Sequence, residues 1–237
     1  MRVALVLAMV CARAAAADPI DAQLVTEIDF EAGHVAQPTS LAPDIWWGFA
    51  PRWTIGLVHS HASVDRFQAG ASLCLGSNDV LACNHVYRGS GLDARYDALS
   101  WLAPRVRLLV RDIDPIKPAV TLGAFIHRRW GRWGIESDPY LQLALANRDQ
   151  GNDNAVVLPV RGLVQLCAWR AWIDTGWNTD LSVWRDGWHI PLGAGVRARV
   201  REDLDLGAEF AFPSLLGPQN TPKERVLFLF VATRWQS

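Results

Sequence analysis

Residues 190–212 read IPLGAGVRARVREDLDLGAEFAF, and apolar side chains recur there at every second position. Over residues 190–200 they alternate with proline, glycine and arginine, and over residues 204–212 with aspartate, glycine and glutamate. Successive side chains of a β-strand point to opposite faces, so each half predicts a strand with one apolar and one polar face. The polar turn at residues 201–203 is short enough to join the two strands into a hairpin.

The same alternation recurs along the chain and predicts about twelve strands. The predicted strands are 23–32, 45–49, 53–60, 91–98, 105–111, 118–127, 135–145, 158–166, 169–177, 190–200, 204–212 and 225–235. Residues 67–75 are a further candidate, so ten or fourteen strands also stay open. A soluble β-sandwich shows the same alternation with its apolar face turned inward, so the period alone does not separate a sandwich from a membrane barrel.

Long polar links alternate with tight turns between these strands. The long links are 33–43, 60–85, 112–117, 147–154, 178–187 and 213–224, and the turns lie near residues 50, 101, 130, 167 and 201. In an antiparallel sheet, all the long links emerge at one end and all the tight turns at the other. Short periplasmic turns with longer extracellular loops are typical of transmembrane β-barrels.

Tryptophan is unusually frequent, with twelve residues in the chain. Six of them fall at the turn end of the predicted strands, namely Trp53, Trp101, Trp130, Trp133, Trp169 and Trp235. Tryptophan is enriched where a protein wall meets the membrane interface, so these residues predict an aromatic girdle. A soluble sandwich gives no reason for tryptophans to gather at one end.

The first residues have the pattern of a secretory signal peptide. Arg2 precedes an unbroken apolar run over residues 3–10, and an alanine-rich segment ends at Ala17. The run is too short to span a bilayer, which takes about 20 apolar residues. We therefore expect residues 1–17 to be removed and residues 18–237 to form a single barrel domain.

Three cysteines follow the predicted signal peptide. Cys74 and Cys83 flank a polar loop, and export predicts a disulfide between them. A zinc site is the alternative, but no second cysteine or histidine pair lies at ligand spacing. Cys167 is left over, and we expect an inert buried thiol there rather than a nucleophile.

Charged residues are spread evenly through the apolar segments. The chain is 50% hydrophobic and 20% charged, with a formal net charge of −1, so no basic surface indicates a nucleic-acid partner. No glycine-rich phosphate loop, nucleophile elbow or zinc signature occurs. The sequence therefore predicts no cofactor, no bound metal and no nucleic acid.

On these features, the chain resembles the bacterial outer-membrane β-barrel superfamily over residues 20–237, and more loosely its small porin-like and transporter-like members. Members of that superfamily usually end in an alternating strand closed by an aromatic residue, which the barrel-assembly machinery recognises. Leu227, Leu229, Val231 and Trp235 approximate that ending, with departures at Thr233 and at residues 236–237.

The resemblance implies an all-β fold, a closed antiparallel up-and-down transmembrane β-barrel in the outer membrane of a Gram-negative cell. Its partners would be outer-membrane lipid and the assembly machinery. Closure would pair the first strand with the last, because an open edge in a bilayer leaves backbone groups without partners.

In such a barrel, the polar strand faces line the lumen. The predicted lumen residues are Glu27, Asp29, Glu31, Asp93, Arg95, Asp97, Arg105, Arg107, Arg111, Glu136, Asp138, Arg161, Arg170, Asp174, Arg197, Arg199, Asp205 and Glu209. A barrel of this size has only a modest lumen. One interpretation is a narrow porin-like channel for small polar solutes, in which facing rows of opposite charge set selectivity. The other is a non-conducting structural or adhesive barrel, whose charges satisfy one another and plug it.

An outer-membrane hydrolase is a third possibility. The concentrated candidates are His59, Ser60, His61 and Asp65. Neighbours on a strand point to opposite faces, so adjacency in the sequence does not bring a serine and a histidine into contact. His59 and His61 share a face and are a candidate metal pair, but we interpret them as loop histidines, and His127 and His189 as lumen or interface residues. We expect no enzyme activity and no catalytic residue.

Overall fold

The computed structural model describes residues 20–31, 34–35, 40–59, 90–113, 115–218, 220 and 223–235. The strands are β1 (Ile20–Glu31), β2 (His34–Val35), β3 (Ser40–Ala50), β4 (Trp53–Val58), β5 (Ser90–Tyr96), β6 (Leu102–Ile113), β7 (Ile116–Trp130), β8 (Trp133–Ser137), β9 (Tyr140–Ala144), β10 (Ala155–Leu166), β11 (Trp169–Asp180), β12 (Trp188–Arg201), β13 (Leu204–Leu216) and β14 (Glu224–Trp235). A short 3₁₀ helix, η1 (Arg148–Gln150), lies between β9 and β10. In the described part of the chain, no helix has both the length and the apolar character needed to cross a membrane.

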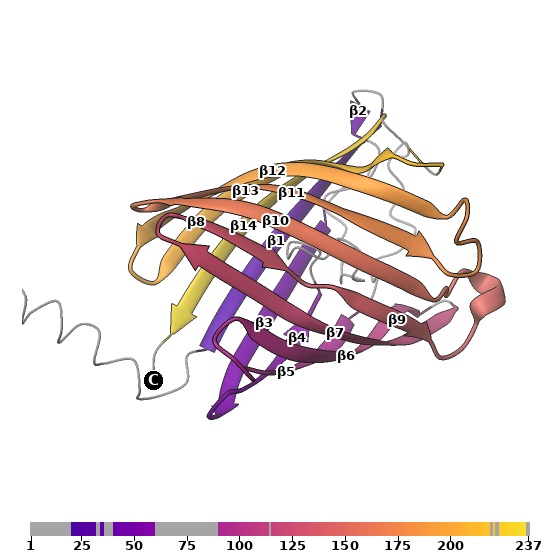
Figure 1. Cartoon of the computed structure of the whole chain (residues 1–237), viewed down its shortest axis with the longest axis horizontal. Helices are drawn as coiled ribbons and strands as arrows, with labels where there is room; N and C mark the ends of the chain where they lie inside the picture. Colours follow the sequence, from indigo (N-terminus) through magenta and orange to yellow (C-terminus); the bar gives the residue numbers. More distant parts are fainter. Residues whose placement is uncertain are drawn as a thin grey trace, which may run out of the picture.

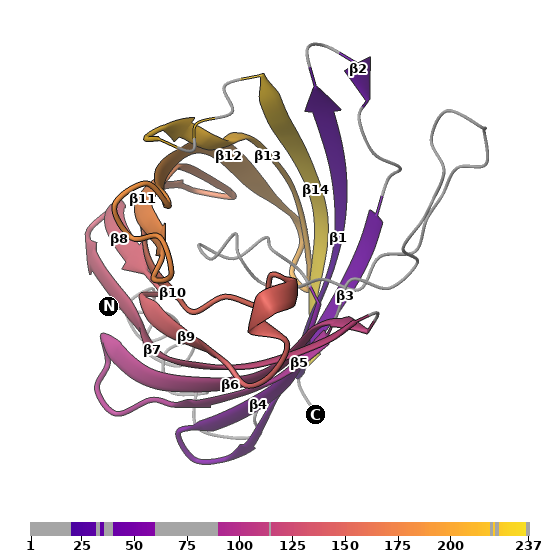
Figure 2. The ribbon, with the colours of Figure 1, turned by 90° about the vertical axis from the view of Figure 1, so that its right-hand side faces the viewer.

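The strands form one closed antiparallel sheet, seen from the side in Figure 1 and along the barrel in Figure 2. β1 pairs with β14 over its whole length, from Ile20 opposite Trp235 to Glu31 opposite Glu224. β2 pairs only with β1, and β8 and β9 together occupy one place in the wall between β7 and β10. The wall therefore has twelve strands, and the predicted fold class and the closure of the first strand on the last are both confirmed.

Four two-residue turns lie at one end of the barrel. Two residues separate β3 from β4, β7 from β8, β10 from β11 and β12 from β13. At the opposite end, the predicted loop at 112–117 is wrong, because β6 and β7 continue through it until Ile113 pairs with Ile116. β3 and β11 also run into the predicted loops 33–43 and 178–187. Backbone pairing continues there because polar side chains do not prevent a ladder from extending.

The predicted strand at 135–145 is interrupted between β8 and β9, at Asp138 and Pro139. Proline has no N–H to give to a neighbouring strand. Its carbonyl still accepts a hydrogen bond from the Ala124 N–H at 3.1 Å, so the wall stays closed. The break does not change which face each residue occupies, because Asp138, Tyr140 and Gln142 are all buried.

The distribution of polarity across the wall is the reverse of that in a soluble protein. Leu92, Leu108 and Ile173 are 55–61% exposed. On the other face of the same strands, Arg107 and Asp174 are only 1% and 3% exposed. Single exposed leucines are common on soluble proteins. A continuous apolar band on the outer surface, with charges enclosed behind it, instead requires an apolar environment to cover it. The hydrocarbon core of a bilayer is that environment, because an antiparallel barrel satisfies its backbone groups internally.

Inward-facing aromatic rings lie over glycines of the adjacent strand. Three directly opposite pairs are Trp46–Gly56, Trp172–Gly195 and Phe230–Gly207. A Cβ atom built at Gly195 would lie 2.3 Å from the Trp172 ring, and one at Gly207 would lie 2.0 Å from the Phe230 ring. Glycine therefore lets each ring lie flat against the inner wall. Trp172 and Phe230 then form a buried apolar cluster with Leu163, Ala211, Val226 and Phe228.

We expect Gly195→Ala to lower the free energy of unfolding by about 1–3 kcal/mol, the usual cost of overpacking. The added methyl group has no space unless the Trp172 ring moves. Urea titration of the folded barrel in lipid vesicles measures the loss. Gly162→Ala is the matched control, because a Cβ at Gly162 meets nothing within 4 Å. Equal losses in the two variants would contradict this account of the aromatic–glycine pairs.

Candidate functional site

Ten of the described charged residues on the inner face form three groups. The β6 cluster comprises Asp93, Arg105, Arg107 and Asp138. The β10 cluster comprises Arg161, Asp174 and Glu209. The turn-end group comprises Arg129, Glu136 and Arg170, near the tight turns that close β7–β8 and β10–β11.

The β6 cluster is compact and electrically balanced. Arg105 donates two hydrogen bonds to Asp93, from Nε to Oδ1 and from Nη2 to Oδ2, each 2.7 Å long. Arg105 and Arg107 both donate to Oδ2 of Asp138. The Trp46 indole N–H also donates to Asp93 Oδ2, at 3.2 Å. Two guanidinium and two carboxylate groups thus neutralise one another, each at most 8% exposed.

The sequence predicts that acids of the strand at 91–98 face arginines of the strand at 105–111. The register does place Asp93 opposite Arg107, but the paired hydrogen bonds of Asp93 are diagonal, to Arg105. Arg107 instead reaches past β7 to Asp138 and lies 5.5 Å from the centre of the Tyr140 ring. Long arginine side chains can choose diagonal partners, so register alone does not determine ion pairs.

The β10 cluster joins three strands of the wall. Arg161 donates to Asp174 from Nε at 2.6 Å and from Nη2 at 2.7 Å, and its Nη2 lies 3.2 Å from Glu209. The Trp172 indole N–H donates to Glu209 at 3.0 Å, and the Arg161 guanidinium lies 4.6 Å from the Trp172 ring centre. Ion pair, indole and ring contacts together fix this side of the inner wall.

The turn-end group is looser than the other two. Glu136 lies 3.8 Å from Arg129 and 3.9 Å from Arg170, both beyond hydrogen-bond length. The Arg129 and Arg170 side chains are 49% and 28% exposed. One carboxylate therefore serves two partly solvated arginines.

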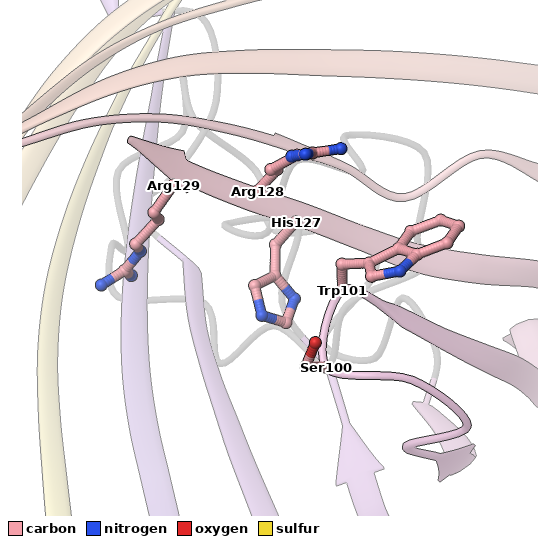
Figure 3. A pocket seen from close by; sticks show the side chains of 5 residues that line it. All are labelled: Ser100, Trp101, His127, Arg128 and Arg129. Atoms are coloured by element: carbon pink, nitrogen blue, oxygen red, sulfur yellow. The ribbon is translucent and has the colours of Figure 1, made fainter. Parts of the chain in front are cut away.

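A pocket of about 690 Å³ lies beside this group, lined by Ser100, Trp101, His127, Arg128 and Arg129. Figure 3 shows His127 and Arg129 on one side of β7 and Arg128 on the other. The side with His127 and Arg129 carries the buried Thr121 and so faces the lumen.

The other described lumen candidates lie closer to the turns. Arg95 lies 3.7 Å from Asp97, and Arg199 lies 3.2 Å from Asp205. Asp97 and Arg199 are the most exposed of these four side chains. Arg197 lies with its guanidinium 4.9 Å from the Phe230 ring centre.

Several predicted residues fall outside the described part of the chain. They are the signal peptide at 1–17, the disulfide candidates Cys74 and Cys83, and Ser60, His61 and Asp65 of the hydrolase candidates. The backbone positions of Glu27, Asp29, Glu31 and Arg111 lie in β1 and β6, but their side chains also lie outside the described part. In the register, Glu27 is opposite Phe228 and Asp29 opposite Val226.

His59 is the one described member of the hydrolase candidates. Its backbone N–H donates to Asp44 at 2.6 Å, and its ring Nδ1 contacts the Pro43 carbonyl. These contacts hold the end of β4 against β3. In the described residues, no group of three or more histidine, cysteine or acidic side chains could hold a metal ion.

The predicted buried thiol at Cys167 is wrong. Cys167 is exposed and has a positive φ of 51°, at the tip of the turn between β10 and β11. A turn residue outside the wall has no neighbours to bury it.

Five of the six tryptophans predicted for the girdle lie on the outer surface near the tight turns. Trp53, Trp101, Trp130, Trp133 and Trp169 are 44–58% exposed, and the side chain of Trp235 lies outside the described part. Arg128 lies 5.8 Å from the ring centre of Trp130, and Arg132 lies 5.8 Å from that of Trp133. Amphipathic rings and guanidinium groups fit the membrane interface.

Two residues that hydrogen-bond to the cluster carboxylates were not predicted as lumen residues. Trp46 and Trp172 donate indole N–H groups to Asp93 and Glu209. Both lie at inward positions opposite a glycine, and that alternation of tryptophan and glycine across neighbouring strands is the feature by which they could have been found.

No protein-family model matches the chain, and no curated protein sequence matches it either. Among solved structures, it is similar to a KdgM porin in complex with disordered oligogalacturonate, with a TM-score of 0.59 at 7% identity over 90% of this chain and 98% of that one. A second structure, of KdgM porin, gives a TM-score of 0.54 at 7% identity over 89% and 98%. At this identity, the similarity is one of fold.

The closed wall, the apolar outer band and the enclosed charges agree with that fold. The outward faces match lipid, and the inward faces carry the ion pairs. The chain is therefore a closed twelve-stranded antiparallel β-barrel, with a fold similar to that of the KdgM porin structures.

Proposed function

We propose that the barrel is a narrow porin-like channel for small polar solutes. The observation that carries this proposal is the closed twelve-stranded wall with charged side chains on its inner face. A barrel of this strand number has a modest lumen, and rings or rows of charge set selectivity in such pores. The structural similarity to KdgM porin, which has been solved with an oligogalacturonate, supports a transport role for this fold.

The two buried clusters narrow the passage on their sides of the wall. Their side chains are at most 12% exposed and held by several hydrogen bonds, so a change to another rotamer would break these bonds. We infer that the free passage lies along the remaining inner surface and that its conductance is small.

The same burial favours a second candidate, a barrel that conducts nothing and presents its outer loops. Buried, mutually neutralised charges are also what a plugged lumen contains. The two functions differ in one property, the presence of a continuous water path.

Single-channel recording in a planar bilayer tests the proposal. We expect discrete openings of small conductance that rise with salt concentration. In liposome swelling, we expect a monosaccharide to enter and a trisaccharide to be excluded. Heat-unfolded protein is the control for nonspecific leakage. Folded barrel that gives neither openings nor swelling would overturn the channel and leave the non-conducting barrel.

A further inference from the structure

We propose that the turn-end group is a binding site for small carboxylate- or phosphate-bearing solutes, a specificity that rests on the proposed channel function. Arg129, Arg170 and Glu136 form its charged part, and Arg129 also lines the pocket that contains His127 and Ser100.

The charge balance separates this group from the two clusters. In the β6 cluster, two arginines meet two aspartates, and in the β10 cluster, one arginine meets two acids. In the turn-end group, two arginines share one glutamate at 3.8–3.9 Å. The local excess of positive charge is therefore at the turn end.

Other charged side chains lie near this group. The electrostatic neighbours of Arg170 are Glu136, Arg129, Arg161 and Asp205, and those of Arg197 are Asp205, Arg170, Arg161 and Glu136. Arg161 is already neutralised by Asp174 and Glu209 in the β10 cluster, so the local excess is that of Arg129 and Arg170 over Glu136. Such a concentration of like charge attracts a counter-ion from solution.

The exposed arginines have the right chemistry for an oxyanion. A guanidinium presents N–H donors in a planar fork that matches carboxylate and phosphate oxygens. Arg129 and Arg170 extend from different strands, β7 and β11, toward the same glutamate. A solute oxyanion between them could replace the long contacts with two short ones.

His127 also indicates that a solute binds in this pocket. It lies two residues before Arg129 on the same face of β7, and it lines the pocket with Ser100 (Figure 3). Its Nδ1 atom is buried and has no hydrogen-bond partner within the described residues. A buried ring nitrogen without a partner costs free energy unless something fills that role. A bound solute in the pocket would do so.

Reversal potentials across a KCl gradient test the site in the conducting barrel. We expect wild-type barrel to prefer chloride over potassium. Arg129→Gln and Arg170→Gln should each lower the chloride-to-potassium permeability ratio by roughly fivefold, and Glu136→Gln should raise it by a similar factor. Arg201→Gln is the matched control, because that arginine is the last residue of β12, is 72% exposed and pairs with Asp203 at 3.4 Å. It should leave the ratio unchanged.

A ratio that is the same in all five proteins would overturn the site and leave the channel standing. If the folded barrel does not conduct, the channel fails instead, and the site is tested by titrating inorganic pyrophosphate into detergent-solubilised barrel in a calorimeter. Saturable binding that is lost in Arg129→Gln and Arg170→Gln but kept in Arg201→Gln supports the site. Absence of binding to the wild-type barrel overturns it.

Discussion

Replacing Asp138 by alanine is expected to lower the free energy of unfolding by about 3–5 kcal/mol, the cost of removing one partner from a buried charge network. Asp138 accepts hydrogen bonds from both Arg105 and Arg107, and the two guanidinium groups are at most 8% exposed. Without that carboxylate, only Asp93 remains to balance the two arginines within the β6 cluster. Urea titration of folding into lipid vesicles, followed by tryptophan fluorescence, measures the change.

Asp97→Ala is the matched control for this prediction. Asp97 also pairs with an arginine, Arg95, but at 3.7 Å and with its side chain 52% exposed. Exposed pairs contribute about 0–1 kcal/mol, so the loss should be small. The double variant Arg107→Met, Asp138→Leu should lose less free energy of unfolding than the sum of the two single variants. It leaves the neutral Arg105–Asp93 pair, whereas each single change leaves the cluster with an unbalanced charge. Equal small losses in Asp138→Ala and Asp97→Ala would show that the β6 cluster is not a buried network.

The second large effect is expected on the outer face. Leu108→Arg should destabilise the barrel by about 2–4 kcal/mol, the cost of an arginine near the bilayer midplane. Leu108 is 55% exposed and lies in the middle of β6, opposite Val120. In water, an arginine at an exposed position would be harmless, so the size of the loss reports the surrounding solvent. The same vesicle titration measures it.

Val200→Arg tests whether the destabilisation by an arginine depends on its depth in the bilayer rather than on the exposure of the position alone. Val200 is 56% exposed, like Leu108, but it lies next to the end of β12 at the tight turns. Near the interface, the cost of an arginine falls to about 0–1 kcal/mol. Two equal losses would argue against a band of lipid around the middle of the wall.

The fold could be predicted from the sequence because the period of two survives in almost every wall strand. Residues 190–212 alone predict the hairpin β12–β13 and the face each side chain occupies. Short turns constrain which strands are neighbours, and closure follows from the need to pair every backbone group in lipid. These are local rules, so one sequence is enough to apply them.

The details of the site depend on side-chain reach, which no local rule gives. The diagonal bonds from Arg105 to Asp93 and the reach of Arg107 past β7 arise from long flexible side chains in a shared interior. Glu136 lies near both Arg129 and Arg170, and these two arginines come from strands β7 and β11, which are far apart in the chain. The 112–117 link was predicted as a loop from its polarity, yet backbone pairing continued through it.

The proposed function depends on one arrangement, in which the apolar strand faces meet lipid and the charged faces are enclosed. It is tested most directly by attaching a fluorophore to Leu108→Cys, Leu206→Cys or Gln165→Cys, each in a Cys167→Ser background because Cys167 is exposed. Leu108 and Leu206 lie on the outer face, and Gln165 lies opposite Arg170 on the inner face. Lipids with brominated acyl chains should quench the label at positions 108 and 206 and leave it bright at 165. Quenching at 108 and 206 by aqueous iodide, with no effect of brominated lipid, would contradict the account.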